Sequence, residues 1–148
     1  MCRTSDTLLG VRAVRAAITA LALAVTACTP AGGPDQCDRG AFRSVQLAHA
    51  NRTEVTLCGT VVRAGRLRRS RSGTHRVFVV DVGGNDRVRI DANVDIMGEF
   101  PIRPGEHAVI RGEYYYDGPG QDGVHWTHRT DRGSHPPGYI TLDGVTYR

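Results

Sequence analysis

The chain has 148 residues and a formal net charge of +4 at pH 7, with 40% hydrophobic and 23% charged residues. This length predicts one domain of ordinary size with a core of its own. All 19 basic residues are arginine. We attribute this bias to GC-rich coding, although arginine also suits two-point contacts with phosphate or carboxylate groups.

The first 27 residues predict an export signal. Arg3, Arg12 and Arg15 give the segment a positive start, and an apolar run follows from Ala16 to Val25. A run of about ten residues is too short to span the ~30 Å hydrocarbon core of a membrane. A charged start, a short apolar core and small residues at its end are typical of a secretory signal. Without this leader the chain is less basic than its whole composition indicates.

The end of this signal indicates a lipid anchor. The residues VTAC at Val25–Cys28 resemble the lipobox of bacterial lipoproteins, although leucine is commoner at the position of Val25. In these proteins the signal is cut before a cysteine that is then acylated. We therefore expect lipidation of Cys28, a flexible tether over 28–36, and an exported protein anchored to the membrane of the cell envelope. The alternative is cleavage nearby that releases a soluble, secreted or periplasmic protein.

The remaining cysteines predict a disulfide. Cys2 leaves with the signal and Cys28 carries the lipid, so Cys37 and Cys58 remain as an even pair in an oxidising compartment. A bond between them closes a loop that is worth roughly 3 kcal/mol by chain entropy. The alternative, a metal-binding thiol pair, is weak at this spacing.

The rest of the chain predicts one helix followed by strands. Phe42, Val45 and Leu47 recur near helical spacing after a capping Asp38, which predicts a helix over about 39–50. Alternating apolar residues and turn residues then predict strands over 54–64, 76–83, 87–92 and 107–116, with further strands within 124–128 and 138–147. We expect the strand at 76–83 to be buried on both faces, and tight turns at 83–86 and at Asp143-Gly144.

This order of elements predicts a mainly β fold. Five or six short strands and one helix point to a small antiparallel barrel or sandwich. Gly59 and Gly112 fall in the middle of their strands, where a barrel has to bend sharply. We therefore predict a small OB-like antiparallel β-barrel over 37–148, with one short N-terminal helix, after the signal peptide and tether.

Several short motifs resemble a family of small exported bacterial proteins that is defined only as a domain of unknown function. The motifs are a GTV strand at Gly59, an H-x-x-F strand start at His75, an N-x-D loop at Asn93, a GEY strand at Gly112 and an HWTH…G-x-H-P-x-G tail over 125–138. The resemblance covers nearly all of 37–148, and the tail is its specific part. It implies that His75, Asn93, Asp95 and Glu113 belong to the candidate ligand site, and it names no reaction.

The chain departs from this family pattern at two positions. The family usually has a second histidine directly after HWTH, where this chain has Arg129. It also tends to have a histidine before the N-x-D asparagine, where Ala92 stands here. Two potential metal ligands are therefore missing from this chain.

The histidine-rich tail supports two interpretations. Imidazole and carboxylate groups could bind a divalent metal such as Zn, Mn or Ni, and Trp126 could stack on a base or a sugar. In this case the metal ligands would come from His125, His128, Asp131 and His135, with Glu113 or Asp95 as a further ligand. In the alternative, Trp126 is part of the core and the histidines hydrogen-bond a proline-rich loop into place.

An arginine-rich segment spans Arg63 to Arg76. In an OB-like barrel it connects the first two strands and borders the face that binds oligonucleotides or oligosaccharides. The candidate ligand-binding residues in it are Arg66, Arg68, Arg69 and Arg71. Alternatively, the segment is a solvated hairpin tip, or it lies against anionic lipid headgroups.

These observations favour a non-enzymatic, exported binding module for an anionic or polar ligand. Its expected partners are the membrane, through Cys28, and a polyanion or envelope polymer, with no specific nucleic-acid target. The first alternative is a metal-dependent hydrolase or nuclease that uses the cluster from His125 to His135. The second is a purely structural envelope protein. No cofactor is expected beyond a possible divalent metal.

Overall fold

The computed structural model describes residues 37–130 and 133–148. The predicted signal, the lipidation site Cys28 and the tether lie outside these residues. Within the described part of the chain, no helix is both long enough and apolar enough to cross a membrane.

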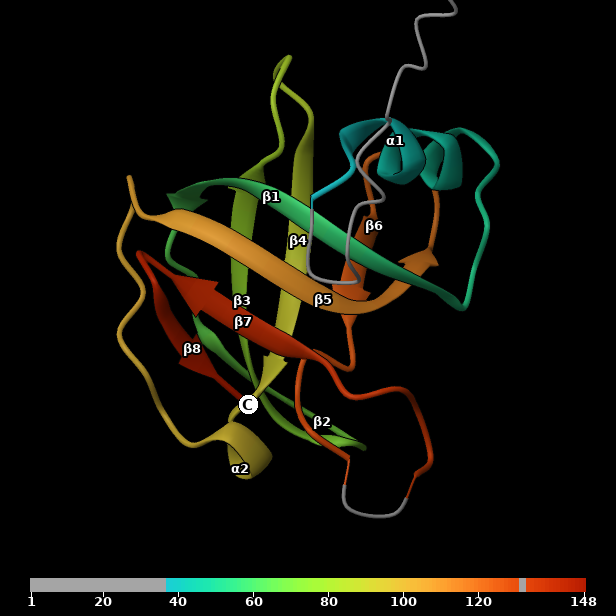
Figure 1. The fold of residues 1–148 in the computed structure, drawn as a ribbon. Helices are drawn as coiled ribbons and strands as arrows, with labels where there is room; N and C mark the ends of the chain where they lie inside the picture. Colours follow the sequence, from blue (N-terminus) through green and yellow to red (C-terminus); the bar gives the residue numbers. More distant parts are fainter. Residues whose placement is uncertain (1–36, 131–132) are drawn as a thin grey trace, which may run out of the picture. The chain divides into compact units, whose positions relative to one another are not determined.

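The described residues form eight strands and two helices (Figure 1). In chain order they are α1 (Arg39–Leu47), β1 (Thr53–Arg63), β2 (Leu67–Ser70), β3 (Gly73–Asp81), β4 (Arg87–Asn93), α2 (Val94–Met97), β5 (His107–Tyr116), β6 (Asp122–His125), β7 (Tyr139–Leu142) and β8 (Val145–Tyr147).

Five of these strands close a barrel. Their order is β1-β3-β4-β6-β5, and β5 pairs back with β1. The β4–β6 pair is parallel and the other pairs are antiparallel. β2 extends β3 beyond the barrel, and the β7–β8 hairpin adds to β5. This arrangement confirms the predicted small OB-like barrel.

Alternate residues of the barrel strands fill its interior. Phe78 and Val80 of β3 are fully buried, whereas the alternate residues Val77 and Val79 are only half-buried. The prediction that 76–83 is buried on both faces was therefore wrong. A strand of a closed barrel packs its inner side chains into the core, so the outer side chains of β3 stay half-buried.

The two mid-strand glycines lie where strands approach closely. A methyl group on Gly112 would lie 2.9 Å from Val124 Cγ1 and 3.0 Å from Thr127 Cγ2. One on Gly59 would lie 2.6 Å from Val80 Cγ1. Real Cβ atoms do not approach other atoms so closely, so these crossings of the barrel require glycine.

Helix α1 packs against one end of the barrel, opposite the end that carries α2 (Figure 1). The Asp38 side chain accepts a hydrogen bond of 2.8 Å from the backbone N–H of Ala41, as predicted for a cap. The helix ends at Leu47, before the predicted boundary, because the chain turns at His49 with a φ of 48°. Phe42 on its inner side contacts the core ring of Tyr114.

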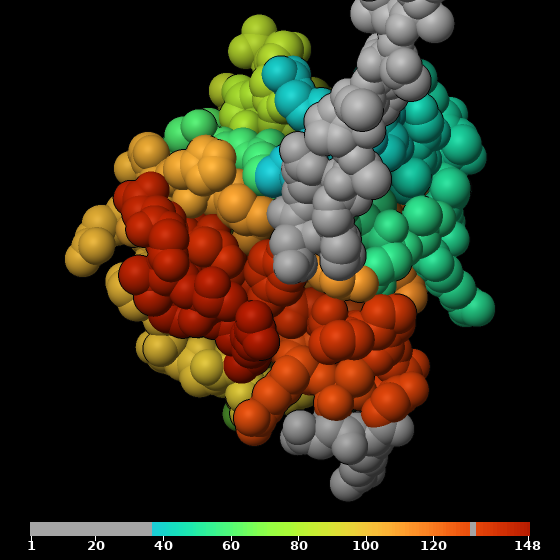
Figure 2. Space-filling model, in the orientation of Figure 1, coloured from blue at the N-terminus to red at the C-terminus, as the bar shows by residue number. Residues whose placement is uncertain are grey.

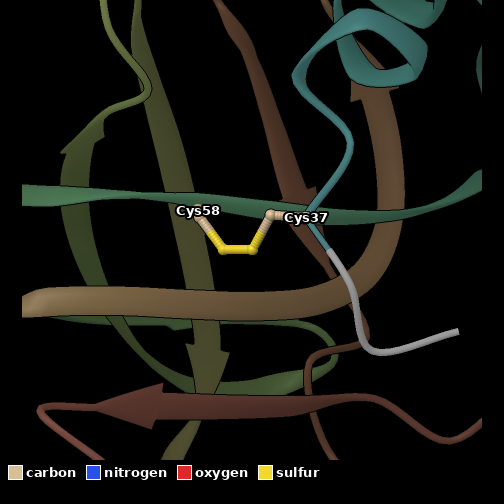
Figure 3. Close-up of a disulfide and its surroundings, with 2 residues drawn as sticks. All are labelled: Cys37 and Cys58. Carbon is tan, nitrogen blue, oxygen red and sulfur yellow. A yellow bond between two sulfur atoms is a disulfide. The ribbon is translucent and has the colours of Figure 1, made fainter. Parts of the chain in front are cut away.

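The disulfide between Cys37 and Cys58 is present, as predicted (Figure 3). The two Cα atoms are 5.6 Å apart, which is an ordinary distance for a disulfide. The bond ties the residue just before α1 to the middle of β1.

Two elements were not predicted. Strand β2 has no buried residue, so its sequence carries no alternating apolar pattern. It is a strand only because it pairs with β3. Helix α2 is a single short turn that begins where the Asn93 side chain accepts a hydrogen bond from Asp95 N–H. The predicted turn at Asp143-Gly144 is confirmed by φ values of 44° and 86°.

Candidate functional site

The outer face of β3 and β4 is the part of the barrel to which a ligand would bind in an OB-like fold, because these are its second and third strands. On β4 the residues Arg87, Arg89 and Asp91 alternate with buried Val88 and Ile90. Successive side chains of a strand point to opposite faces, so the first three lie on the outer face together.

Two hollows in this region each contain three arginines in their lining, and the second also contains Asp122. One has a volume of about 600 Å³ and contains Arg63, Arg66 and Arg68 in its wall. The other has a volume of about 510 Å³ and contains Arg63, Arg87 and Arg89. Because they share Arg63, we treat them as one feature, the arginine groove, made of these five arginines.

Most of these arginines are free to bind a ligand. Within the described residues, the guanidinium groups of Arg63, Arg66, Arg68 and Arg87 have no carboxylate within ion-pair distance. Arg89 differs, because it pairs with Asp91 at 3.3 Å and with Asp117 at 4.0 Å, and its Nε also donates a hydrogen bond to the hydroxyl of Tyr115. The four unpaired cations make the groove a site of positive potential.

The register of the β2–β3 pair shows that the four arginines predicted to bind a ligand do not all lie on one face. Arg68 pairs with His75, and Arg69 pairs with Thr74. Neighbouring residues of a strand face opposite ways, so Arg66 and Arg68 lie on the groove side and Arg69 lies on the other side. Arg71 lies in the exposed turn between β2 and β3.

Asn93 and Asp95 hold this hairpin in place. The Asn93 side-chain amide donates a hydrogen bond of 3.0 Å to the carbonyl of Ser72. The Asp95 carboxylate accepts one of 2.7 Å from the backbone N–H of Thr74. His75 pairs with Asn93 across the sheet, so these residues position the arginine-bearing strand β2.

A second cluster lies on the outer face of β5 and β6. His125 and Glu113 are direct partners in the strand register, and their Nε2 and Oε1 atoms are 3.1 Å apart. Burial lowers the pKa of His125, and Glu113 opposes this shift only in part. A neutral His125 therefore donates its Nε2–H to Glu113 near pH 7.

Tyr115 joins this cluster to the arginine groove. Its hydroxyl donates a hydrogen bond of 2.7 Å to Asp91 and accepts the one from Arg89. Its ring lies edge-on to His125, with 5.2 Å between centroids. One continuous chain of contacts thus runs from Arg89 to His125.

The chain turns sharply after His125. Strand β6 ends there, and Trp126 has a φ of 54°, a conformation that is an outlier for a bulky residue. Because of this turn Thr127 and His128 are buried, whereas Trp126 is 36% exposed. The alternative in which Trp126 is part of the core was therefore wrong.

The segment 126–138, here called the histidine loop, folds back on itself. Its residues (orange-red) lie at the surface next to the C-terminal hairpin (dark red) in Figure 2. Gly138 N–H donates a hydrogen bond of 2.9 Å to the carbonyl of His128 at the base of the loop. The rings of His128 and His135 are perpendicular, with 4.8 Å between centroids.

Each of these two histidines also contacts its own backbone. The Nδ1 atoms of His128 and His135 lie 2.7 Å from the carbonyl oxygens of Arg129 and Pro136, so each Nδ1–H donates to a carbonyl. Burial lowers the pKa of His128. This geometry supports the interpretation in which the histidines pin the loop.

The predicted metal site stays a prediction. Among residues 37–130 and 133–148, no group of three or more His, Cys, Asp or Glu side chains could hold a metal ion. The predicted ligand Asp131 lies outside the described residues. His128 and His135 would keep their Nε2 atoms for a metal, since the carbonyls engage Nδ1.

Sequence reasoning missed several residues of this site. It did not select Arg87, Arg89 or Asp91. The alternation of "RVRID" over 87–91 was a usable signal, because it places Arg87, Arg89 and Asp91 on one face. No local pattern indicates that Tyr115 meets Arg89, since these residues come from different strands.

Comparison with known proteins identifies a family but no activity. The family model described as "Protein of unknown function (DUF3465)" matches residues 20–148. This range includes the whole barrel, the arginine groove and the histidine loop. No curated protein matches the chain.

Proposed function

The chain belongs to the DUF3465 family of proteins of unknown function, and we propose that it is a binding module that holds an anionic polymer along its arginine groove. The observation that carries this proposal is the set of unpaired guanidinium groups on the ligand-binding face of an OB-like barrel. The four arginines are Arg63, Arg66, Arg68 and Arg87.

A polyanion is the expected ligand because a cluster of unpaired positive charges is electrostatically unfavourable. Like charges on neighbouring strands repel, and elsewhere in the described barrel the arginines of the strands have partners, such as Arg111 with Glu54 at 3.3 Å. A bound polyanion would neutralise the groove and release counterions. Guanidinium groups also bind phosphate, sulfate or carboxylate through two parallel hydrogen bonds.

We propose further that the module is exported and anchored in the cell envelope through Cys28. The leader and the VTAC sequence at Val25–Cys28 support this location. The groove would then face the polymers of the envelope, many of which are anionic.

Inorganic polyphosphate tests the charge requirement alone, because it has no ring and no hydroxyl face. We expect binding that weakens as salt rises. The variant Arg66→Gln plus Arg68→Gln should reduce the slope of log K against log salt by about two, roughly one for each arginine. It should also weaken binding about tenfold at low salt.

The matched control is Arg43→Gln plus Arg103→Gln, which removes the same charge outside the groove. These arginines form exposed pairs with Asp86 and Glu106, and such pairs add little stability. An equal loss of polyphosphate binding in both double variants would contradict the proposal, since only net charge would then matter. Binding without salt dependence would contradict it as well.

A further inference from the structure

Trp126 is an exposed aromatic surface that the barrel holds in a fixed position. It is the only tryptophan of the chain. Its ring lies 4.6 Å from His135 and 5.2 Å from His125, measured between centroids, at interplanar angles of 35° and 49°. The ring of His128 also contacts Trp126, with 5.8 Å between the centroids.

The backbone under Trp126 is constrained too. A residue as bulky as tryptophan adopts its φ of 54° only where the surroundings impose it, and such strain concentrates at ligand sites. Thr127, the next residue, is fully buried. A methyl group on Gly138 would lie 2.8 Å from Thr127 Cα, so the returning strand of the loop fixes this turn.

Carboxylates lie on the strands beside His125. Glu113 bonds His125, and Glu54 is the direct partner of Glu113 on β1. Asp91 lies on the same face, and its charge acts on His125. Glu54 is paired with Arg111, and Asp91 is paired with Arg89. Glu113 has no arginine partner among the described residues, and its carboxylate accepts hydrogen bonds from hydroxyl groups, as do neutral imidazoles.

The two parts of the face are connected. Trp126 contacts His125, His125 contacts Tyr115, and Tyr115 binds Arg89 of the groove. A ligand that follows this path meets an aromatic surface with hydroxyl acceptors first and the arginine groove second.

We propose that the polymer is an acidic glycan and that Trp126, with His125 and Glu113, is the subsite for one of its sugar rings. This inference rests on the proposed function, which it makes more specific. The apolar face of the sugar stacks on Trp126, and its hydroxyl groups bond Glu113 and His125. The acidic groups of the following sugars reach Arg87, which lies on the same face of β4 as Arg89.

The experiment compares four probes on the full-length protein: oligogalacturonate, its methyl ester, oligo-dT of equal charge and inorganic polyphosphate. Fluorescence reports on Trp126 alone, because no other tryptophan is present. We expect oligogalacturonate to change this fluorescence saturably and to bind more tightly than its neutral ester. Trp126→Ala should lower its affinity, measured by calorimetry, about tenfold or more, whereas Trp126→Phe should retain part of it.

Polyphosphate measures the groove without the subsite and shows that each variant is folded. If Trp126→Ala binds oligogalacturonate like the wild type and polyphosphate still binds, the glycan subsite is refuted and the arginine groove stands. If the affinity for oligo-dT depends on Trp126 and the affinity for oligogalacturonate does not, the subsite binds a nucleic-acid base and the glycan assignment is wrong. If neither polyphosphate nor oligogalacturonate binds, the proposed function fails together with this inference.

Discussion

Trp126 and His128 show how one backbone angle decides which side chain is offered to a ligand. A regular strand through 124–128 would place Trp126 and His128 on the same face. The positive φ of Trp126 instead exposes the tryptophan and buries His128 at 4% exposure. The buried imidazole supports the loop, and the exposed indole is left for binding.

The buried histidines make stability depend on pH. Burial lowers the pKa of His125 and of His128 below the ordinary 6.5. Above pH 6.5 both histidines are neutral in the folded and in the unfolded state, and their contribution to stability is complete. As the pH falls below 6.5, the unfolded state takes up protons before the folded state does, so the free energy of unfolding decreases. We expect a lower free energy of urea unfolding at pH 5.5 than at pH 7.5.

The variant His128→Gln isolates this contribution. It should show a smaller loss of unfolding free energy between pH 7.5 and pH 5.5 than the wild type, whatever its absolute stability. Burial raises the pKa of Glu54, which favours the folded state on acidification and so acts in the opposite direction. An unchanged pH dependence in the variant would contradict the role given to His128.

Gly138 tests how tightly the histidine loop is closed. A methyl group there would lie 2.7 Å from the carbonyl oxygen of Arg111 and 2.8 Å from Thr127 Cα. Because both contacts are with backbone, Gly138→Ala should cost about 1–3 kcal/mol in unfolding free energy, measured in urea. Gly40→Ala in α1 is the control, since its nearest contact is Asp38 Oδ1 at 3.3 Å, and it should be neutral or slightly stabilising.

At the level of elements, β2 depends on its neighbours for its structure. All of its residues are exposed, so no burial holds it in place. Its order comes from pairing with β3 and from the bonds of Asn93 and Asp95 to the turn at 72–74. The strand has no buried residue and no hydrophobic face. These bonds explain why it still holds Arg66 and Arg68 at defined positions.

The disulfide is a second element-level constraint. It closes the loop between Cys37 and Cys58, with 21 residues of sequence separation, and so limits the unfolded chain. The double variant Cys37→Ser, Cys58→Ser should lose about 3 kcal/mol of unfolding free energy. Reductant should destabilise the wild type by a similar amount and leave the double variant unchanged, and equal stability of all three samples would contradict this expectation.

At the level of the whole molecule, the lipid anchor proposed at Cys28 would hold the binding face at the membrane. If Cys28 carries lipid, the wild type should sediment with membranes and need detergent for release. The variant Cys28→Ala should appear in the soluble exported fraction. A wild-type protein found only in the soluble fraction would exclude the anchor and leave the arginine groove unaffected.

Much of the barrel could be predicted from the sequence, because its signals are local. Apolar alternation located β4 and β5, and the capping Asp38 located the start of α1. The even pair of cysteines indicated the disulfide. The four-residue elements β2 and α2 were missed, since each forms through contacts with other parts of the chain.

The candidate site was only partly predictable for the same reason. Trp126, His75 and Arg68 stand out by residue type. The contacts of Arg89 with Tyr115 and Asp91 join three strands, and only the closure of the barrel brings them together. The backbone turn at Trp126 likewise depends on Gly138, twelve positions further along the chain.

The sequence by itself determined the class of fold, the disulfide pair, and the leader that predicts export, because periodicity and residue type carry these properties. Only the tertiary structure decided which arginines share a face, which histidine is buried and which aromatic ring is exposed. These properties depend on strand register and on single backbone angles. Both are set by contacts between residues that lie far apart in the chain.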